Sequence, residues 1–205
     1  DRKSLEKNPN LDLFRRKKLE VLFISDPIDE FLLAHLRNFQ GKDLVAIDSA
    51  QVELPPASEA NQAEAANAQE RQAAAESSGF QRVLELFREE LKDDVQEVRA
   101  SQRLTDSVCC LVNPEGSLSA QLQKVLAMGD REFTLTKKIF ELNPQAPLIA
   151  RLSACSDNVA NAPFIKQCGR QLFANALLLE GLPLDPSELV SRVQGFMLEA
   201  AEKRS

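Results

Sequence analysis

The spacing of apolar residues predicts most of the helices in the second half of the chain. From residue 78 to residue 91 apolar residues recur every three or four positions, which is typical of a helix with one buried face. The same spacing continues over 163–179, and Gly181 can end that helix. Asp185 can cap the last helix, with Pro186 at its first position. The apolar stripe of this helix is wide: Leu189, Val190, Val193, Phe196, Met197, Ala200 and Ala201.

Short apolar runs predict strands. The runs 21–24 and 44–47 flank a helix that follows Asp26, and this order predicts two buried parallel strands joined by a helix. Further strands are expected around 95–104 and 107–113. The predicted inward stripe of the helix after Asp26 consists of Ile28, Leu32, Leu36 and Phe39, with His35 on the same face.

A polar segment divides the chain into two parts. Residues 51–78 are rich in Ala, Glu, Gln and Asn and hold too few large apolar side chains to bury much surface, so they are expected to form a linker or a loosely held helix. The predicted fold class is α+β, with a small α/β subdomain over 1–50 and a mixed α/β domain over 79–205. The terminal stripe can pack on its own domain. Alternatively, the last two helices can meet those of a second copy in a four-helix bundle.

Composition argues against several classes of function. The net charge of −6 and the absence of Trp and Tyr disfavour a nucleic-acid partner. No apolar run approaches the roughly 18 residues that cross a bilayer, so no membrane partner is expected. The scattered glycines form no phosphate-binding loop. We therefore predict no catalytic residue and no cofactor site in this chain.

The cysteines do not form a metal-binding pattern. Cys109, Cys110, Cys155 and Cys168 contain no C-x-x-C pair, and the single histidine, His35, cannot complete a zinc set. We expect Cys109 and Cys110 to be small core residues on opposite faces of a strand, with a redox role as the weaker alternative.

Two apolar surfaces could contact other molecules. Leu118, Leu122, Val125 and Leu126 form a compact face on a helix predicted over 117–128. Phe31 lies at the edge of the stripe on the helix after Asp26. A face of either kind can equally be an ordinary core face.

Several motifs, in the correct order, resemble the ninety-kilodalton heat-shock chaperones. They are 20–31 (EVLFISDPIDEF), 39–42 (FQGK), 95–99 (VQEVR), 103–107 (RLTDS), 109–112 (CCLV), 119–121 (SAQ) and 141–144 (ELNP), followed by the closing helices. The resemblance covers nearly the whole chain apart from 51–78. The sequence AEKRS at 201–205 differs from the acidic tail of the eukaryotic cytosolic members. The chain is therefore similar to the bacterial HtpG type or to an organellar relative.

The resemblance implies part of an ATP-driven molecular chaperone. The nucleotide site, with its ATP and Mg²⁺, and the catalytic Arg would lie outside this chain, so the chain itself would not be an enzyme. Residues 1–50 would end the middle domain and 79–205 would be the dimerisation domain. Expected partners are a second copy and partly folded client proteins, in the bacterial cytoplasm or in an organelle. A purely structural dimerisation domain and a thiol protein are the alternatives.

The resemblance also implies contact residues. Clients would touch Phe31, Leu118, Leu122, Val125 and Leu126. The dimer interface would contain Leu172, Phe173, Leu177, Leu189, Val190, Val193, Phe196 and Met197.

Overall fold

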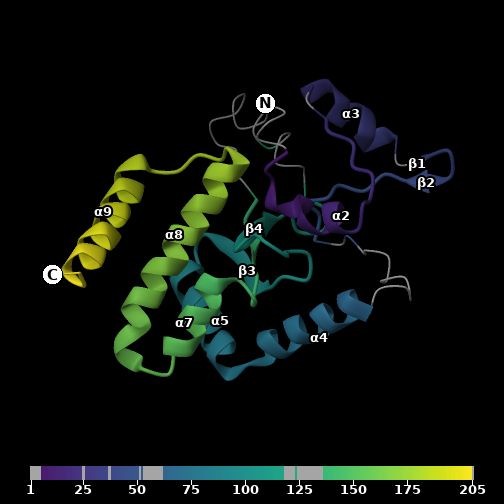
Figure 1. Cartoon of the computed structure of the whole chain (residues 1–205). Coiled ribbons are helices and arrows are strands. Elements are labelled where there is room, and N and C mark those ends of the chain that lie inside the picture. The colour runs from purple at the N-terminus through teal and green to yellow at the C-terminus, as the bar shows by residue number, and fades with distance from the viewer. Residues whose placement is uncertain are drawn as a thin grey trace.

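The computed structural model describes residues 6–24, 26–36, 38–50, 52, 62–117, 123 and 136–204 (Figure 1). The elements before residue 77 are η1 (Pro9–Leu11), α2 (Asp12–Arg16), α3 (Pro27–His35), β1 (Asn38–Phe39), β2 (Lys42–Asp43) and α4 (Gln62–Glu76). Those after it are α5 (Ser78–Leu91), β3 (Val95–Ala100), β4 (Cys109–Val112), β5 (Lys138–Leu142), α7 (Pro147–Cys155), η2 (Val159–Asn161), α8 (Ala162–Glu180) and α9 (Pro186–Glu202).

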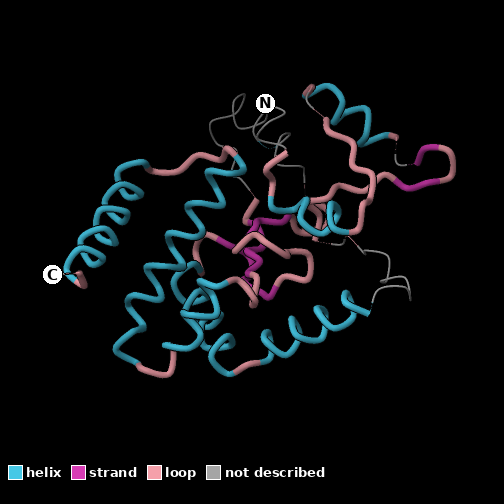
Figure 2. The backbone as a smooth tube through the Cα atoms, in the orientation of Figure 1, coloured by secondary structure: helices cyan, strands magenta, loops and turns pink. Residues whose placement is uncertain are grey.

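The core of the second half is a small mixed sheet covered by helices (Figure 2). Its strand order is β3-β5-β4, with β5 parallel to β3 and antiparallel to β4. Helices α5, α7 and α8 pack together, and α5 and α8 also contact the sheet. At the centre, the rings of Phe140 and Phe173 meet edge to face with 5.7 Å between their centroids. The mixed helix and strand content confirms the predicted α+β class.

Two helix-end signals predicted in this half, Gly181 and Asp185, are confirmed, whereas the cap at Ser77 was not predicted. Ser77 accepts a hydrogen bond from the Phe80 N–H at the start of α5. Gly181 ends α8 in the left-handed conformation at φ 63°, which glycine adopts without steric cost. The Asp185 carboxylate accepts a hydrogen bond from the Ser187 N–H at 2.8 Å and so caps α9.

The central strand β5 was not predicted. Its five residues are all buried, yet the strand includes Lys138 and Glu141. Both charges have partners inside the structure, and this pairing lets them occupy a buried strand. Helix α7 was missed as well.

The strands predicted over 21–24 and 44–47 are not formed. Both segments are irregular, and Leu22 is 70% exposed. Among the described residues before 51, the only strands are β1 and β2, which form a short hairpin that turns through Gln40 and Gly41 at positive φ. A buried parallel strand needs paired neighbours and cover on both faces, and the described residues provide neither here.

The predicted inward stripe of α3 is exposed. Ile28 is 68% exposed, and Leu32 and Leu36 are exposed too. Because α3 ends at His35, Phe39 lies in β1 instead of on this helix, and it is exposed as well. His35 is also exposed, so the prediction that it lies on an inward, core-facing side of the helix is wrong. The described residues therefore leave this face of α3 uncovered.

The polar segment contains a helix. Helix α4 occupies residues 62–76, within the segment where a linker or a loosely held helix was expected, and is followed at once by α5. It contacts the second half through Arg71, which donates a hydrogen bond to the Gln102 carbonyl at 3.0 Å.

Candidate interaction surface

Helices α8 and α9 form a hairpin at the end of the chain (Figure 1). Helix α8 turns one face into the domain core, where it buries Ile165, Cys168, Leu172, Phe173 and Ala176. Helix α9 packs on α8 through the rings of Phe164 and Phe196, whose centroids are 6.0 Å apart. The Lys203 ammonium lies 5.7 Å from the centroid of the Phe164 ring.

Much of the apolar stripe of α9 remains uncovered. None of the residues of α9, all of which the structure describes, is buried. Val190 and Met197 are 52% and 66% exposed, and Val193 is exposed as well. These three lie within about 60° of arc at 100° per residue, beside the edge that Leu189 and Phe196 present. One edge of the stripe is therefore half-buried, and the other faces outward.

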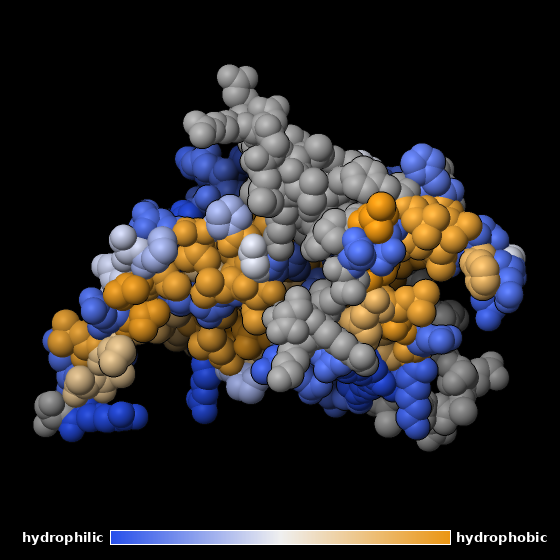
Figure 3. Space-filling view, turned by 90° about the horizontal axis from the view of Figure 1, so that it is seen from above, coloured by the Kyte–Doolittle hydropathy of each residue, from blue (hydrophilic) through white to orange (hydrophobic). Residues whose placement is uncertain are grey.

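The exposed apolar surface extends to the end of α8. Leu178 and Leu179, just before the turn at Gly181, are both exposed. Hydrophobic side chains gather on the side of the molecule that carries α8 and α9, and again on the opposite side around α3 (Figure 3). Exposed apolar side chains gathered on one side of a molecule are typical of sites that contact another protein.

The structure divides the residues that the sequence assigned to a dimer interface. Leu172 and Phe173 lie in the core of their own domain, so their side chains are not available to a second chain in this structure. Leu177, Leu189 and Phe196 are half-buried. The remaining three, Val190, Val193 and Met197, are exposed. That these residues meet a second copy stays a prediction.

The residues expected to touch clients are mostly outside the description. Leu118, Leu122, Val125 and Leu126 do not belong to the described residues. Phe31 lies in α3, but its side chain is outside the description too. Client contact through these residues stays a prediction.

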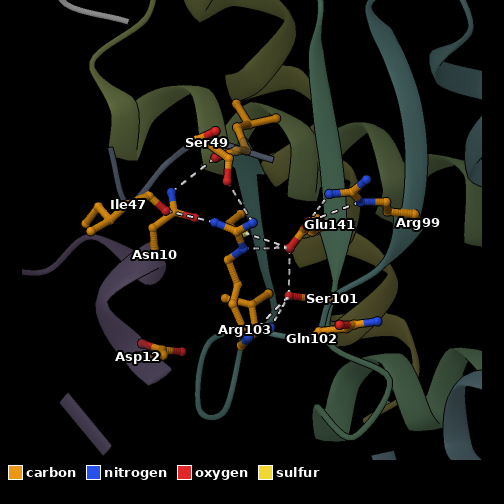
Figure 4. A network of polar contacts seen from close by, with 12 residues as sticks. Asn10, Asp12, Ile47, Ser49, Arg99, Ser101, Gln102, Arg103 and Glu141 are labelled. Carbon is orange, nitrogen blue, oxygen red and sulfur yellow. Dashed lines mark hydrogen bonds and ion pairs between the residues drawn. The ribbon is translucent and has the colours of Figure 1, made fainter. Parts of the chain in front are cut away.

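A buried polar network, which sequence reasoning missed, joins the first 50 residues to the second half (Figure 4). At its centre the Glu141 carboxylate, whose side chain is 3% exposed, lies between the guanidinium groups of Arg99 at 2.8 Å and Arg103 at 3.2 Å. The Ser101 hydroxyl donates a third contact at 2.8 Å. A buried carboxylate is costly unless it is paired, and these donors supply the pairing. We call these four residues the Glu141 cluster.

Arg103 extends the Glu141 cluster to the N-terminal segment. Its guanidinium donates to the carbonyls of Ile47 at 2.8 Å and Ser49 at 3.0 Å. Asp12 makes a second connection, because its carboxylate accepts from the backbone N–H groups of Thr105, Asp106 and Ser107. The segments 103–107 and 141–144 were noted as motifs without a role. The sequence signal that could have revealed the network is the pair of charged residues, Lys138 and Glu141, in the otherwise apolar run 138–142.

The adjacent cysteines of β4 behave as core residues. Cys109 and Cys110 lie in different hydrophobic clusters, on opposite faces of β4 as expected. Burial raises the pKa of Cys109 to about 12. Burial, with a smaller contribution from the Glu141 charge, raises the pKa of Cys110. Both thiols are therefore protonated near neutral pH, which disfavours the redox alternative.

The described residues hold neither of two other kinds of feature. No group of three or more His, Cys, Asp or Glu side chains there is arranged to hold a metal ion. In the same part of the chain, no helix combines the length and the apolar content needed to span a membrane.

Comparison with known proteins gives a consistent result. The model of the family described as "Hsp90 protein" matches residues 1–204. The Chaperone protein HtpG of Desulfotalea psychrophila is 34% identical over 196 residues, which cover 93% of this chain and 30% of that protein. The proteins of the same name from Geobacter sulfurreducens and Bordetella parapertussis are 35% and 36% identical, over 96% and 94% of this chain and 30% and 29% of their own lengths. The chain thus spans about 30% of the length of these relatives.

Proposed function

Since the chain belongs to the Hsp90 protein family, we propose that it is the homodimerisation and client-binding part of a molecular chaperone. The relatives named above are bacterial, which favours the bacterial type and a place in the bacterial cytoplasm over an organelle. The ATP and Mg²⁺ of the proposed chaperone would bind to a part of the protein outside this chain.

The observation that carries the dimer proposal is the uncovered stripe of α9. Burying a Val or Met side chain contributes about 1.5–3 kcal/mol relative to leaving it exposed. In a twofold interface every residue counts twice, because the same patch is used by both copies. Helices α8 and α9 of two copies would then form a four-helix bundle that covers Val190, Val193 and Met197.

The test is the mass of the chain in solution. We expect sedimentation equilibrium to show a concentration-dependent dimer, and Met197→Asp to raise its Kd at least tenfold by burying a charge at the interface. The matched control is Ser191→Asp, which places the same charge on an exposed position about 120° away around α9. We expect less than a threefold change for the control. A wild-type chain that stays monomeric at micromolar concentration would refute the dimer proposal.

Client binding is the second part of the proposal. It is supported by the resemblance and by the exposed Ile28 and Leu32 beside Phe31 on α3. We expect Leu118→Ser combined with Leu122→Ser to lower affinity for a partly folded client severalfold, and Phe31→Ser to do so independently. The control is Lys124→Ser, on the opposite face of the predicted 117–128 helix. Unchanged client affinity in both the Leu118→Ser/Leu122→Ser variant and the Phe31→Ser variant would leave a purely structural dimerisation domain as the better explanation.

A further inference from the structure

A second buried polar chain lies at the other end of β5, distinct from the Glu141 cluster. Lys138 begins this strand, and its side chain is only 7% exposed. Its ammonium donates a hydrogen bond to the Asn113 side-chain oxygen at 2.5 Å and forms an ion pair with Glu180 at 3.7 Å. Lys138 therefore connects two elements that are far apart in sequence.

Asn113 carries the connection to the N-terminal segment. Its side-chain N–H group donates to the Asp48 carboxylate at 2.8 Å, and its backbone N–H donates to the Asp48 carbonyl at 2.7 Å. The Asn113 carbonyl accepts from the Ala50 N–H at 2.9 Å. Because a carboxylate faces one end of the amide and an ammonium faces the other, the charges fix the orientation of this side chain.

Glu180 links Lys138 to the end of α8, next to the proposed dimer surface of α8 and α9. It is the last residue of α8, directly before Gly181, where the chain leaves the helix in the left-handed conformation. The Leu182 N–H then bonds the Leu177 carbonyl, and Leu182 is buried. The position of Glu180 thus affects both the exposed end of α8 and the start of the connection to α9.

The geometry points to a polar relay, formed by Asp48, Asn113, Lys138 and Glu180, through which residues 46–50 set the affinity of the α8–α9 dimer. This regulation rests on the proposed dimer. Lys138 and Asn113 are buried, so a lost partner cannot be replaced freely by water and the contacts form or break together. When residues 46–50 withdraw, Asn113 loses the carboxylate that orients it, and Lys138 loses its acceptor. The ion pair that holds the end of α8 then weakens.

The polar relay can be tested by a double-mutant cycle on the dimer Kd. Asp48→Asn and Glu180→Gln remove charges at the two ends of the relay with little change of shape. We expect each to raise the Kd about threefold or more, and the double variant to raise it by much less than the product of the two factors. The control Glu115→Gln removes an exposed charge close to Asn113 in sequence and should change the Kd by less than twofold.

Hydrogen exchange gives a second measurement that a local role for Asp48 would not change. In Asp48→Asn we expect faster exchange of the Gly181 and Leu182 amides, whose hydrogen bonds end α8. If Asp48→Asn does not fold, Ala50→Pro, which removes the N–H that bonds Asn113, takes its place. The polar relay is overturned if the variants leave the dimer Kd and the amide exchange rates unchanged. It is also overturned if the Kd effects of Asp48→Asn and Glu180→Gln are independent in the double-mutant cycle. Either result leaves the dimer proposal intact. A monomeric wild-type chain overturns both.

Discussion

Helices α8 and α9 have similar lengths, 19 and 17 residues, and both carry a long apolar stripe, but they differ in what covers it. Helix α8 buries its stripe against α5 and the sheet, whereas no residue of α9 is buried in this fully described helix. The spacing of apolar residues is therefore the same signal for a core helix and for an interaction helix. What separates the two is the cover that the rest of the fold provides.

The largest difference is expected for truncation of a leucine. Leu172→Ala in α8 should lower the free energy of unfolding by about 2–5 kcal/mol, because it removes buried methyl groups and leaves a cavity. Leu198→Ala in α9, where the side chain is 62% exposed, should change it by less than about 0.5 kcal/mol. Urea unfolding at a concentration that favours the monomer measures both. Equal losses would mean that α9 is as well covered as α8.

A smaller effect of the same kind is expected at the glycine of α8. A Cβ at Gly169 would lie 2.8 Å from the Phe87 ring, which is itself fully buried and cannot move freely. Gly169→Ala should therefore destabilise the chain by about 1–3 kcal/mol through overpacking. Thermal unfolding would show it as a lower Tm. An unchanged Tm would indicate that α5 and α8 are less closely packed than they are in this structure.

The smallest effect, of opposite sign, is expected at the glycine of α9. No described atom lies within 4 Å of a Cβ placed at Gly195. Gly195→Ala should stabilise the helix by up to about 1 kcal/mol, because alanine loses less backbone entropy than glycine in a helix. Circular dichroism during urea unfolding can measure the gain. A loss of stability here would contradict the open surroundings of α9.

Apolar spacing does not show what covers an apolar face, and this limit explains which predictions from the sequence failed. The helices at 78–91, 162–180 and 186–202 were predictable because their spacing and caps are local signals. The spacing could not show that Leu172 faces its own core, or that Ile28 faces outward, since it identifies an apolar face without its cover. Strand β5 was missed for the opposite reason. The buried charges of Lys138 and Glu141 break the apolar pattern, and their partners Glu180 and Arg103 lie far away along the chain.

The Asp12 contacts also constrain the order in which the protein can assemble. The three N–H groups that Asp12 accepts belong to residues 93–95 positions later in the chain. At a synthesis rate of about 5–20 residues per second, Asp12 is synthesised roughly 5–20 s before these groups. The Asp12 carboxylate must therefore stay without these native partners for that interval, open to contact with other proteins during synthesis.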